Sequence, residues 1–473
     1  MHHDLRQCYW FDSLTNGAGA RPSLQQDIDV DIAIVGAGYT GLWTAYHLKQ
    51  LKPELSIVIL EAEHVGFGAS GRNGGWLMGE IAGLDSYLAA RNEDLRTLAY
   101  REVHSIPARA GEVLQREGID CDFAHGGAIY AAARYPGQLA MARAHLAALR
   151  AAGHSEADYR WLDADELRQL ARVAGGRGAI FTPHVAAVQP AKLVTGLASV
   201  VERHGVRIHE GSRVIASSAG ELHTATSRVR APVVISALEG YGAGADSATK
   251  SGRPFILPFQ SGMVISEPLS AAIWDEIGLA GRQVLSDYSR LATYVQRTQD
   301  DRLVFGARGG YRFGGKPISS FSGDDPAFET RRRLARSFFP VLEQAAFTHA
   351  WGGTLGIARR FAPHVVYDRA RGEGTAGGYT GEGVGASFLF GLTLAELVLD
   401  QDSVRTCLPW VFRGNSADVL RRWEPEPLRW LGFKAAWGVY GWEESVLSRG
   451  SAGRWHKRLA GMAGAAVARL LSP

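Results

Sequence analysis

Cysteine is scarce in this chain, and the three that occur are far apart. Cys8, Cys121 and Cys407 form no C-x-x-C pair and are odd in number, which argues against a disulfide framework and a cysteine zinc site. We therefore expect a reducing, cytoplasmic environment. No apolar run approaches the roughly 20 residues that a membrane-spanning helix needs. The first residues, MHHDLRQCYWFDSL, lack the apolar core of a secretory signal.

An excess of charge of one sign is also missing. Lys and Arg number 51 against 48 Asp and Glu, which leaves a formal charge of +3. Because no basic run with interleaved aromatics occurs either, we expect no nucleic-acid partner. Hydrophobic residues make up 46% and charged residues 21% of the 473 positions, as in an ordinary globular protein large enough for two domains. Glycine, with 57 residues, is in excess, and it suits a backbone that approaches a large ligand closely.

The most informative glycines follow a short apolar run near the N-terminus. Residues 31–35 are typical of a buried parallel strand, and Gly36, Gly38 and Gly41 follow in the spacing G-x-G-x-x-G. Gly36 allows the tight turn, Gly38 lets the backbone approach a pyrophosphate, and Gly41 lets helix and strand pack closely. Residues 40–51 then have a helical pattern, and the N-terminus of such a helix favours phosphates.

An acidic residue completes this pattern. Residues 57–60 predict a second strand, and Glu61 at its end lies twenty residues after Gly41, where a carboxylate can accept hydrogen bonds from an adenosine ribose. A structural glycine turn is the alternative interpretation. The register of strand, helix, second strand and acid favours a dinucleotide site.

A second glycine-rich loop follows directly. A nicotinamide-type domain does not need such a loop, whereas an FAD enzyme needs the chain to run along the pyrophosphate and under the flavin ring. An ordinary flexible loop is the alternative. The loop contains Gly66, Gly68, Gly71, Gly74 and Gly75, with Ser70, Arg72 and Asn73 among them.

The segments DVDIAIVGAGYTGLWTAYHL and ILEAEHVGFGASGRNGG resemble the FAD-dependent D-amino-acid oxidase superfamily, above all its branch of γ-glutamylputrescine oxidase-like and glycine- or sarcosine-oxidase-like enzymes. The resemblance implies an α/β plus α+β fold, in which a discontinuous Rossmann-like FAD-binding domain carries an inserted substrate domain with a mostly antiparallel sheet. The expected division is an N-terminal segment 1–26, FAD-binding parts 27–83, 181–240 and 346–405, substrate-domain parts 84–180 and 241–345, and a tail 406–473.

A third glycine-rich segment, GGYTGEGVGASFLFGLTLAELV at residues 377–398, resembles the C-terminal flavin motif of the same branch. It predicts a helix over 386–399 whose N-terminus faces the flavin pyrimidine. Many relatives have a histidine where this chain has Glu382, and we expect this carboxylate to point away from the flavin or to meet a cation. Relatives with covalent flavin use a cysteine or histidine that this chain lacks, so we expect non-covalent FAD.

The resemblance assigns the cofactor to residues of all these segments. They are Gly36, Gly38, Tyr39, Thr40, Gly41, Glu61, Ala62, Gly68, Ala69, Ser70, Arg72, Asn73, Gly74, Gly75, Val214, Ala237, Leu238, Gly352, Gly381, Glu382, Gly383, Val384 and Gly385.

Substrate recognition requires polar groups over the flavin. The candidates are Tyr294, Arg308, Tyr311, Arg312 and Trp351. Arg308 could clamp a carboxylate or phosphonate or form a surface or inter-domain salt bridge, and Trp351 could equally be a core residue. The family needs no side-chain base for the C–H bond, so we assign no catalytic residue and no metal.

The resemblance therefore implies an oxidase that takes a hydride from a small amine or amino acid onto flavin N5, giving an imine and, with O2, hydrogen peroxide. Fitting substrates are a γ-glutamylputrescine-like amine, an N-methyl amine or an aminophosphonate. Residues 302–306 lack the lysine that assists oxygen reduction in sarcosine-oxidase-like relatives, which keeps a dehydrogenase open. A nicotinamide enzyme and a non-catalytic flavin protein are further alternatives.

The two ends of the chain are rich in aromatic residues. Trp10 is expected to pack on the surface of the FAD-binding domain. The tail contains Trp410, Trp423, Trp430, Trp437, Trp442 and Trp455. Its periodicity allows a membrane-surface helix, but prolines and polar breaks favour packing onto the FAD-binding domain or onto a second subunit.

Overall fold

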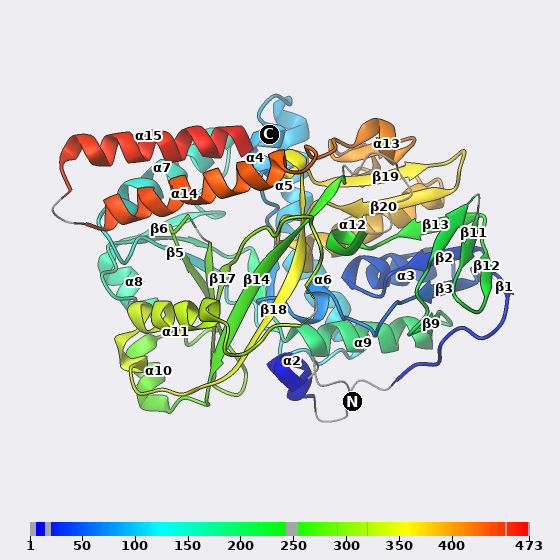
Figure 1. Cartoon of the computed structure of the whole chain (residues 1–473), viewed down its shortest axis with the longest axis horizontal. Helices are drawn as coiled ribbons and strands as arrows, with labels where there is room; N and C mark the ends of the chain where they lie inside the picture. Colours follow the sequence, from blue (N-terminus) through cyan, green and yellow to red (C-terminus); the bar gives the residue numbers. More distant parts are fainter. Residues whose placement is uncertain are drawn as a thin grey trace.

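The computed structural model describes residues 6–14, 20–218, 220–242, 254–290, 292–318, 320–449 and 452–471. Two large sheets lie beside each other along the long axis of the molecule (Figure 1). One has seven strands and the other eight. This confirms the expected mixture of an α/β layer with a second, largely antiparallel sheet.

The seven-stranded sheet has the order β21-β19-β20-β13-β2-β3-β9. Its central pairs are parallel, and helices cover its faces, as in other parallel sheets. The helix α12 is buried along nearly its whole length against α3, because it is apolar on all sides. The strands are β2 (Ile32–Val35), β3 (Ile57–Leu60), β9 (Arg207–His209), β13 (Val233–Ser236), β19 (His364–Asp368), β20 (Glu373–Gly377) and β21 (Val411–Arg413), and the covering helices are α3 (Tyr39–Leu51), α9 (Pro190–Arg203) and α12 (Gly383–Val398).

The eight-stranded sheet has the order β18-β14-β17-β16-β15-β5-β7-β6. Its pairs are antiparallel except for β15 with β5. Two helices, α10 (Ala271–Ile277) and α11 (Pro326–Phe338), accompany it. The strands are β5 (Ala128–Ala131), β6 (Arg160–Leu162), β7 (Ala179–Thr182), β14 (Ile256–Ser266), β15 (Val284–Asp287), β16 (Thr293–Arg297), β17 (Leu303–Arg308) and β18 (Phe347–Ala358).

Two small sheets and the remaining helices complete the described chain. A four-stranded sheet contains β1 (Ile28–Asp29), β10 (Ala216–Ser218), β11 (Glu221–His223) and β12 (Arg228–Arg230), and β4 (Trp76–Met78) pairs with β8 (Val185–Ala187). The other helices are α2 (Tyr9–Asp12), α4 (Leu84–Leu88), α5 (Glu93–His104), α6 (Ile106–Glu117), α7 (Gly137–Ala152), α8 (Ala164–Leu170), α13 (Ser416–Val419), α14 (Leu428–Ser448) and α15 (Arg454–Leu471), with short 3-10 turns η1 (Ala69–Gly71), η3 (Pro340–Leu342), η4 (Arg359–Phe361) and η5 (Arg405–Cys407).

Three of the expected domain boundaries differ from the structure. The strand β21 was expected in the tail after residue 405, but it pairs with β19 in the seven-stranded sheet. The helices α5 and α6 were expected in the substrate domain, but they bury Val103, Ala110 and Leu114 in the core of the seven-stranded sheet. The return to that sheet was expected at residue 346, but β18 pairs with β14 along its length. Without β18, the long strand β14 would present an unpaired edge, so the return begins only at β19.

The N-terminal aromatic segment packs more deeply than we expected, and the tail follows the expectation only in part. Trp410 is buried in the core of the seven-stranded sheet, whereas α14 lies elsewhere. Trp10 is 0% exposed and is packed between the sheets, with its ring edge on Trp351 and its indole N–H donated to the Asn73 carbonyl. In the tail, α14 packs Phe433 on the eight-stranded sheet, against Phe259 of β14, rather than on the FAD-binding layer. Figure 1 shows α14 and α15 side by side over this half of the molecule.

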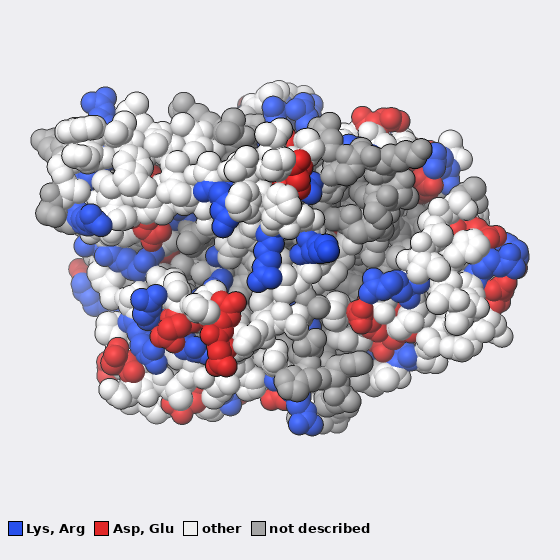
Figure 2. Space-filling model, viewed as in Figure 1, with Lys and Arg blue, Asp and Glu red and all other residues white. Residues whose placement is uncertain are grey.

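The distribution of charged side chains on the surface agrees with the nearly equal numbers of basic and acidic residues in the sequence. Figure 2 shows blue and red side chains intermixed on this face, without a broad field of one sign. Among the described residues, no helix combines the length and the apolar character required to cross a membrane.

Candidate active site

A cavity of about 1070 Å³ opens where the two large sheets meet. Its volume is at the upper end of the roughly 300–1,000 Å³ typical of small-molecule sites. The seven-stranded side contributes the glycine loops after β2 and β3, and the eight-stranded side contributes Tyr294 and Arg308. The cavity therefore joins the predicted dinucleotide site to the predicted substrate groups.

The first glycine loop has the geometry that its spacing predicts. Gly36 has φ +108°, which favours glycine, and a Cβ there would lie 2.7 Å from the Ala237 oxygen. A Cβ on Gly41 would lie only 2.2 Å from the Gly36 oxygen, so the strand and the helix α3 approach each other at this glycine. Gly38 is the N-cap of α3, and a Cβ there would meet the Ser70 hydroxyl at 2.8 Å.

Glu61 is fixed by backbone groups at the end of β3. Its Oε2 accepts the Ala37 N–H at 2.8 Å, and its Oε1 accepts the Glu63 N–H at 3.0 Å. Burial raises the pKa of this carboxyl, although the two N–H groups oppose the shift. The carboxylate lines the cavity and retains lone pairs for a ribose hydroxyl.

The second glycine loop brings a buried guanidinium to the cavity. Arg72 is 4% exposed and lines the cavity, and its Nε donates to the Phe67 carbonyl at 2.9 Å. Its buried Nη2 has no hydrogen-bond partner among the described residues. A buried, unpartnered donor is costly, so this nitrogen fits an acceptor atom of a bound cofactor.

The third glycine segment places a helix N-terminus at the same cavity. The helix α12 begins at Gly383, earlier than the expected residue 386, and both Gly383 and Val384 line the cavity. The preceding loop is tied to α3 through the Tyr379 and Thr40 hydroxyls, which are 2.9 Å apart. Glu239 accepts the Tyr379 N–H from the other side. The free N–H groups and positive dipole end of this helix suit a ring that gains negative charge on reduction.

Arg308 and Glu382 define the polar end of the cavity. Arg308 Nη2 donates to the Thr380 carbonyl at 3.0 Å. Glu382 lines the cavity, and its buried Oε2 has no hydrogen-bond partner among the described residues. Burial and the nearby Glu80 raise the pKa of Glu382 to about 8, against the opposing charge of Arg308. Glu382 is therefore placed to receive a cation.

Glu80 lies behind this end as a second buried carboxyl. It accepts hydrogen bonds from the hydroxyl of Tyr130, which lines the cavity, and from Tyr159 Oη at 2.8 Å. Burial raises its pKa, and the two tyrosines oppose the shift. Nothing in the local sequence around Glu80 indicated this contact, because Tyr130 and Tyr159 come from β5 and from the turn before β6.

Three of the five predicted substrate residues lie outside the described cavity lining. Tyr311 is held by Glu426 and Arg429 near α14, and Arg312 is exposed. Trp351 is 1% exposed and donates its indole N–H to the Arg72 carbonyl at 3.0 Å, so the core interpretation holds for it. Tyr294 lines the cavity with its hydroxyl 2.7 Å from the Ser261 hydroxyl.

Most of the predicted cofactor residues line the cavity. Four do not: Gly41, Gly75, Gly352 and Gly385, where a Cβ would instead meet neighbouring protein atoms within 3 Å. Residues that the sequence did not single out but that line the cavity include Trp76, Met78, Tyr130, Glu239, Tyr241 and Ser261. The described lining contains no cysteine, histidine or lysine.

Comparison with known proteins agrees with this geometry. A family model described as FAD dependent oxidoreductase matches residues 31–397. The chain belongs to this family. The glycine loops, the fixed Glu61 and the unpartnered Arg72 nitrogen are consistent with FAD as the bound dinucleotide, and the expected family and fold are confirmed.

Two curated relatives share 28% identity with the chain. Gamma-glutamylputrescine oxidoreductase from Escherichia coli matches over 397 residues, 80% of this chain and 85% of the relative. Probable oxidoreductase OrdL from Haemophilus influenzae matches over 414 residues, 83% of this chain and 88% of the relative.

Among solved structures, the glycine oxidase of Geobacillus kaustophilus has a TM-score of 0.64 at 23% identity, covering 79% of this chain and 96% of that one. An L-amino acid deaminase from Proteus vulgaris also has a TM-score of 0.64, at 15% identity, covering 83% of this chain and 99% of that one. At these identities the likeness concerns the fold alone.

Proposed function

We propose that this FAD-dependent oxidoreductase oxidises the carbon–nitrogen bond of a small primary or secondary amine, or of an amino acid, that carries an anionic group. The observation that carries the proposal is the pair of Arg308 and Glu382 at one end of the cavity. Arg308 offers a fork of donors for a carboxylate or phosphonate, and Glu382 offers a carboxylate for a cationic nitrogen. The name of the Escherichia coli relative, which includes a γ-glutamylated diamine, supports the same class.

FAD, when bound, would accept the hydride, which carries the two electrons of the reaction. The amine carbon loses a hydride and the nitrogen loses a proton, so an imine forms, and water hydrolyses it to an aldehyde or keto acid and ammonia or an amine. The protein's side chains bind and orient: Arg308 holds the anionic group, and Glu382 holds the nitrogen. In this proposal the seven-stranded layer carries FAD and the eight-stranded sheet covers the substrate.

In the oxidase reaction, O2 takes up two electrons and two protons and becomes hydrogen peroxide. A dehydrogenase that passes electrons to a carrier or quinone is the second candidate. It is favoured by the lack of a lysine in the described cavity lining, since the resembled sarcosine oxidases use a lysine for oxygen reduction. Peroxide formed in step with substrate loss supports the oxidase, and turnover only with an added quinone or dye supports the dehydrogenase.

The cofactor is proposed to be non-covalent, because the described lining contains neither cysteine nor histidine. The test is the visible absorption spectrum of the purified protein before and after acid precipitation. Flavin that moves into the supernatant supports the proposal, and flavin that stays in the pellet contradicts it.

The amine proposal is tested by anaerobic mixing with γ-glutamylputrescine, glycine, sarcosine and an aminophosphonate. Bleaching of the flavin absorbance by one of these, but not by the same molecule without its anionic group, is the expected result. Bound flavin that no amine or amino acid in such a panel reduces would refute the proposal.

A further inference from the structure

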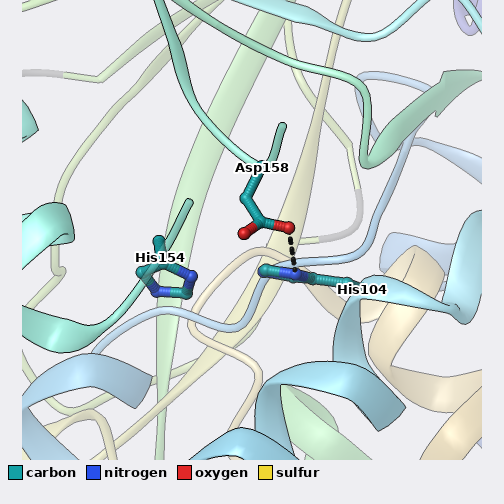
Figure 3. A group of neighbouring side chains, drawn as sticks. All are labelled: His104, His154 and Asp158. Carbon is teal, nitrogen blue, oxygen red and sulfur yellow. Dashed lines mark ion pairs between the residues drawn. The ribbon is translucent and has the colours of Figure 1, made fainter. Parts of the chain in front are cut away.

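Three histidines and an aspartate meet outside the cavity, beside the β6–β7 end of the eight-stranded sheet. His104 is the last residue of α5, and His154 and Asp158 lie in the turn between α7 and β6. His184 lies in the turn between β7 and β8. Figure 3 shows the Asp158 carboxylate directed at His104, with the His154 ring beside them. None of the four residues lines the cavity.

The distances within this cluster are close to those of a metal site. Asp158 Oδ1 lies 3.4 Å from His104 Nδ1 and 3.1 Å from His184 Nε2. The site can draw one ligand atom from each of His104, His154 and Asp158, and these three atoms all lie within 4.8 Å of one another. Zinc bonds of roughly 2.0–2.1 Å in a tetrahedron separate neighbouring ligand atoms by about 3.3 Å. The Asp158–His104 separation therefore already matches, and His154 would have to move inward. The His184 ring is stacked on the His104 ring, with centroids 4.0 Å and planes 13° apart. Because the lone pairs of two stacked rings do not point at one ion, His184 orients Asp158 and is not itself a ligand.

The ligand atoms are oriented by their other contacts. Asp158 Oδ2 accepts the Ser155 N–H at 2.8 Å and the Ser155 hydroxyl at 2.6 Å, which leaves Oδ1 for the histidines. His154 Nε2 lies 3.3 Å from Asp85 Oδ1, and a carboxylate on one nitrogen commonly orients a histidine that binds metal through the other.

We propose that His104, His154 and Asp158 form a zinc site, with a water molecule as the fourth ligand. Imidazole and carboxylate ligands in a four-coordinate arrangement suit Zn²⁺ better than the hard cations Ca²⁺ and Mg²⁺, which prefer oxygen ligands. The bound metal joins the end of α5 to the turn before β6.

The site is also connected to the cavity wall. The Tyr159 ring lies 5.0 Å from the His154 ring, measured between centroids. The Tyr159 hydroxyl donates to Glu80, which also accepts a hydrogen bond from Tyr130 in the cavity lining. A metal at the cluster therefore fixes the elements that hold Glu80 behind the polar end of the cavity.

The test measures metal in the flavin-loaded protein. Because the chain begins with His2 and His3, which bind metal on their own, every protein carries His2→Ala and His3→Ala. After zinc loading and desalting, mass spectrometry should find about one zinc per chain. Asp158→Asn and His104→Asn should each weaken zinc binding at least about tenfold.

The matched control is His223→Ala. His223 pairs with Glu221 at 2.8 Å away from the cluster, so its removal should leave zinc binding unchanged. Retention of the flavin spectrum shows that each variant is folded. Two results would overturn the zinc site in favour of a purely hydrogen-bonded cluster. One is a parent protein that contains no zinc, and the other is an equal zinc content in the parent, Asp158→Asn and His104→Asn.

A second measurement does not depend on any variant of the cluster. Cobalt in place of zinc in a tetrahedral nitrogen and oxygen site gives intense absorption in the red region, where oxidised flavin is transparent. We expect the cobalt absorption band to saturate at one equivalent of cobalt per chain, and we expect added zinc to remove the band. No saturable cobalt band in the parent protein would count against the proposal.

Discussion

The raised pKa of Glu382 makes ligand binding depend on pH in a calculable way. This acid has its pKa raised to about 8, so it is mostly neutral at pH 6 and mostly ionised at pH 9. A ligand that requires the carboxylate binds with an apparent Kd that equals its intrinsic Kd divided by the ionised fraction of Glu382. That fraction rises from about 0.01 to about 0.9, so affinity should rise about 90-fold from pH 6 to pH 9.

The ligand for this test is N,N,N-trimethylglycine. Its quaternary nitrogen keeps its charge at every pH and has no lone pair for oxidation, and its carboxylate suits Arg308. Binding is followed through the change it causes in the flavin spectrum, at pH 6, 7, 8 and 9. In Glu382→Gln the affinity should be weak and independent of pH over this range.

The control is Glu239→Gln, because Glu239 also lines the cavity and burial raises its pKa to about 7. This variant should keep the midpoint near pH 8. An affinity of the parent protein that is constant between pH 6 and pH 9, or a dependence that survives in Glu382→Gln, would refute the assignment of Glu382 to the cationic nitrogen.

Three further predictions concern binding and stability. Arg308→Lys keeps the charge but loses the planar fork, so KM for an anionic amine should rise about 10- to 100-fold, and an unchanged KM would contradict the role. Gly41→Ala should lower the thermal unfolding midpoint, because overpacking costs about 1–3 kcal/mol. Gly432→Ala has no neighbouring atom within 4 Å of the new Cβ and should stabilise α14 by about 1 kcal/mol; equal effects of the two changes would refute this reasoning. Arg290 donates to the 2%-exposed side chain of Glu443 at 2.7 and 2.9 Å, so Arg290→Ala should cost about 3–5 kcal/mol in urea unfolding, and adding Glu443→Gln should restore most of it.

The dinucleotide half of the site could be predicted because its signals are local. Glycine spacing between two β-branched runs specifies the turn, the helix start and the position of Glu61. These are properties of neighbouring residues, and the structure places Gly36, Gly38 and Glu61 on the cavity. The antiparallel character of the second sheet was available only through the resemblance to a family.

The substrate end was predicted less well, because its residues are brought together by long-range pairing. Tyr311 and Arg312 are close to Arg308 in sequence, but a turn of the chain directs Tyr311 to the start of α14, where Arg429 holds it. The pairing of β18 with β14 likewise shifted a domain boundary.

The sequence by itself determined the first glycine turn and the dinucleotide class of the cofactor, because glycines and β-branched residues restrict the backbone within a few positions. The family followed from the resemblance of whole segments to known proteins. Only the tertiary structure decided the environment of the charged groups. Glu382 has its raised pKa because Glu80 lies close to it and burial excludes water. His104, Asp158 and His184 meet because a helix end and two turns pack together. The pKa and the contacts of a charged side chain depend on its neighbours in space, and these neighbours are distant from it in the sequence.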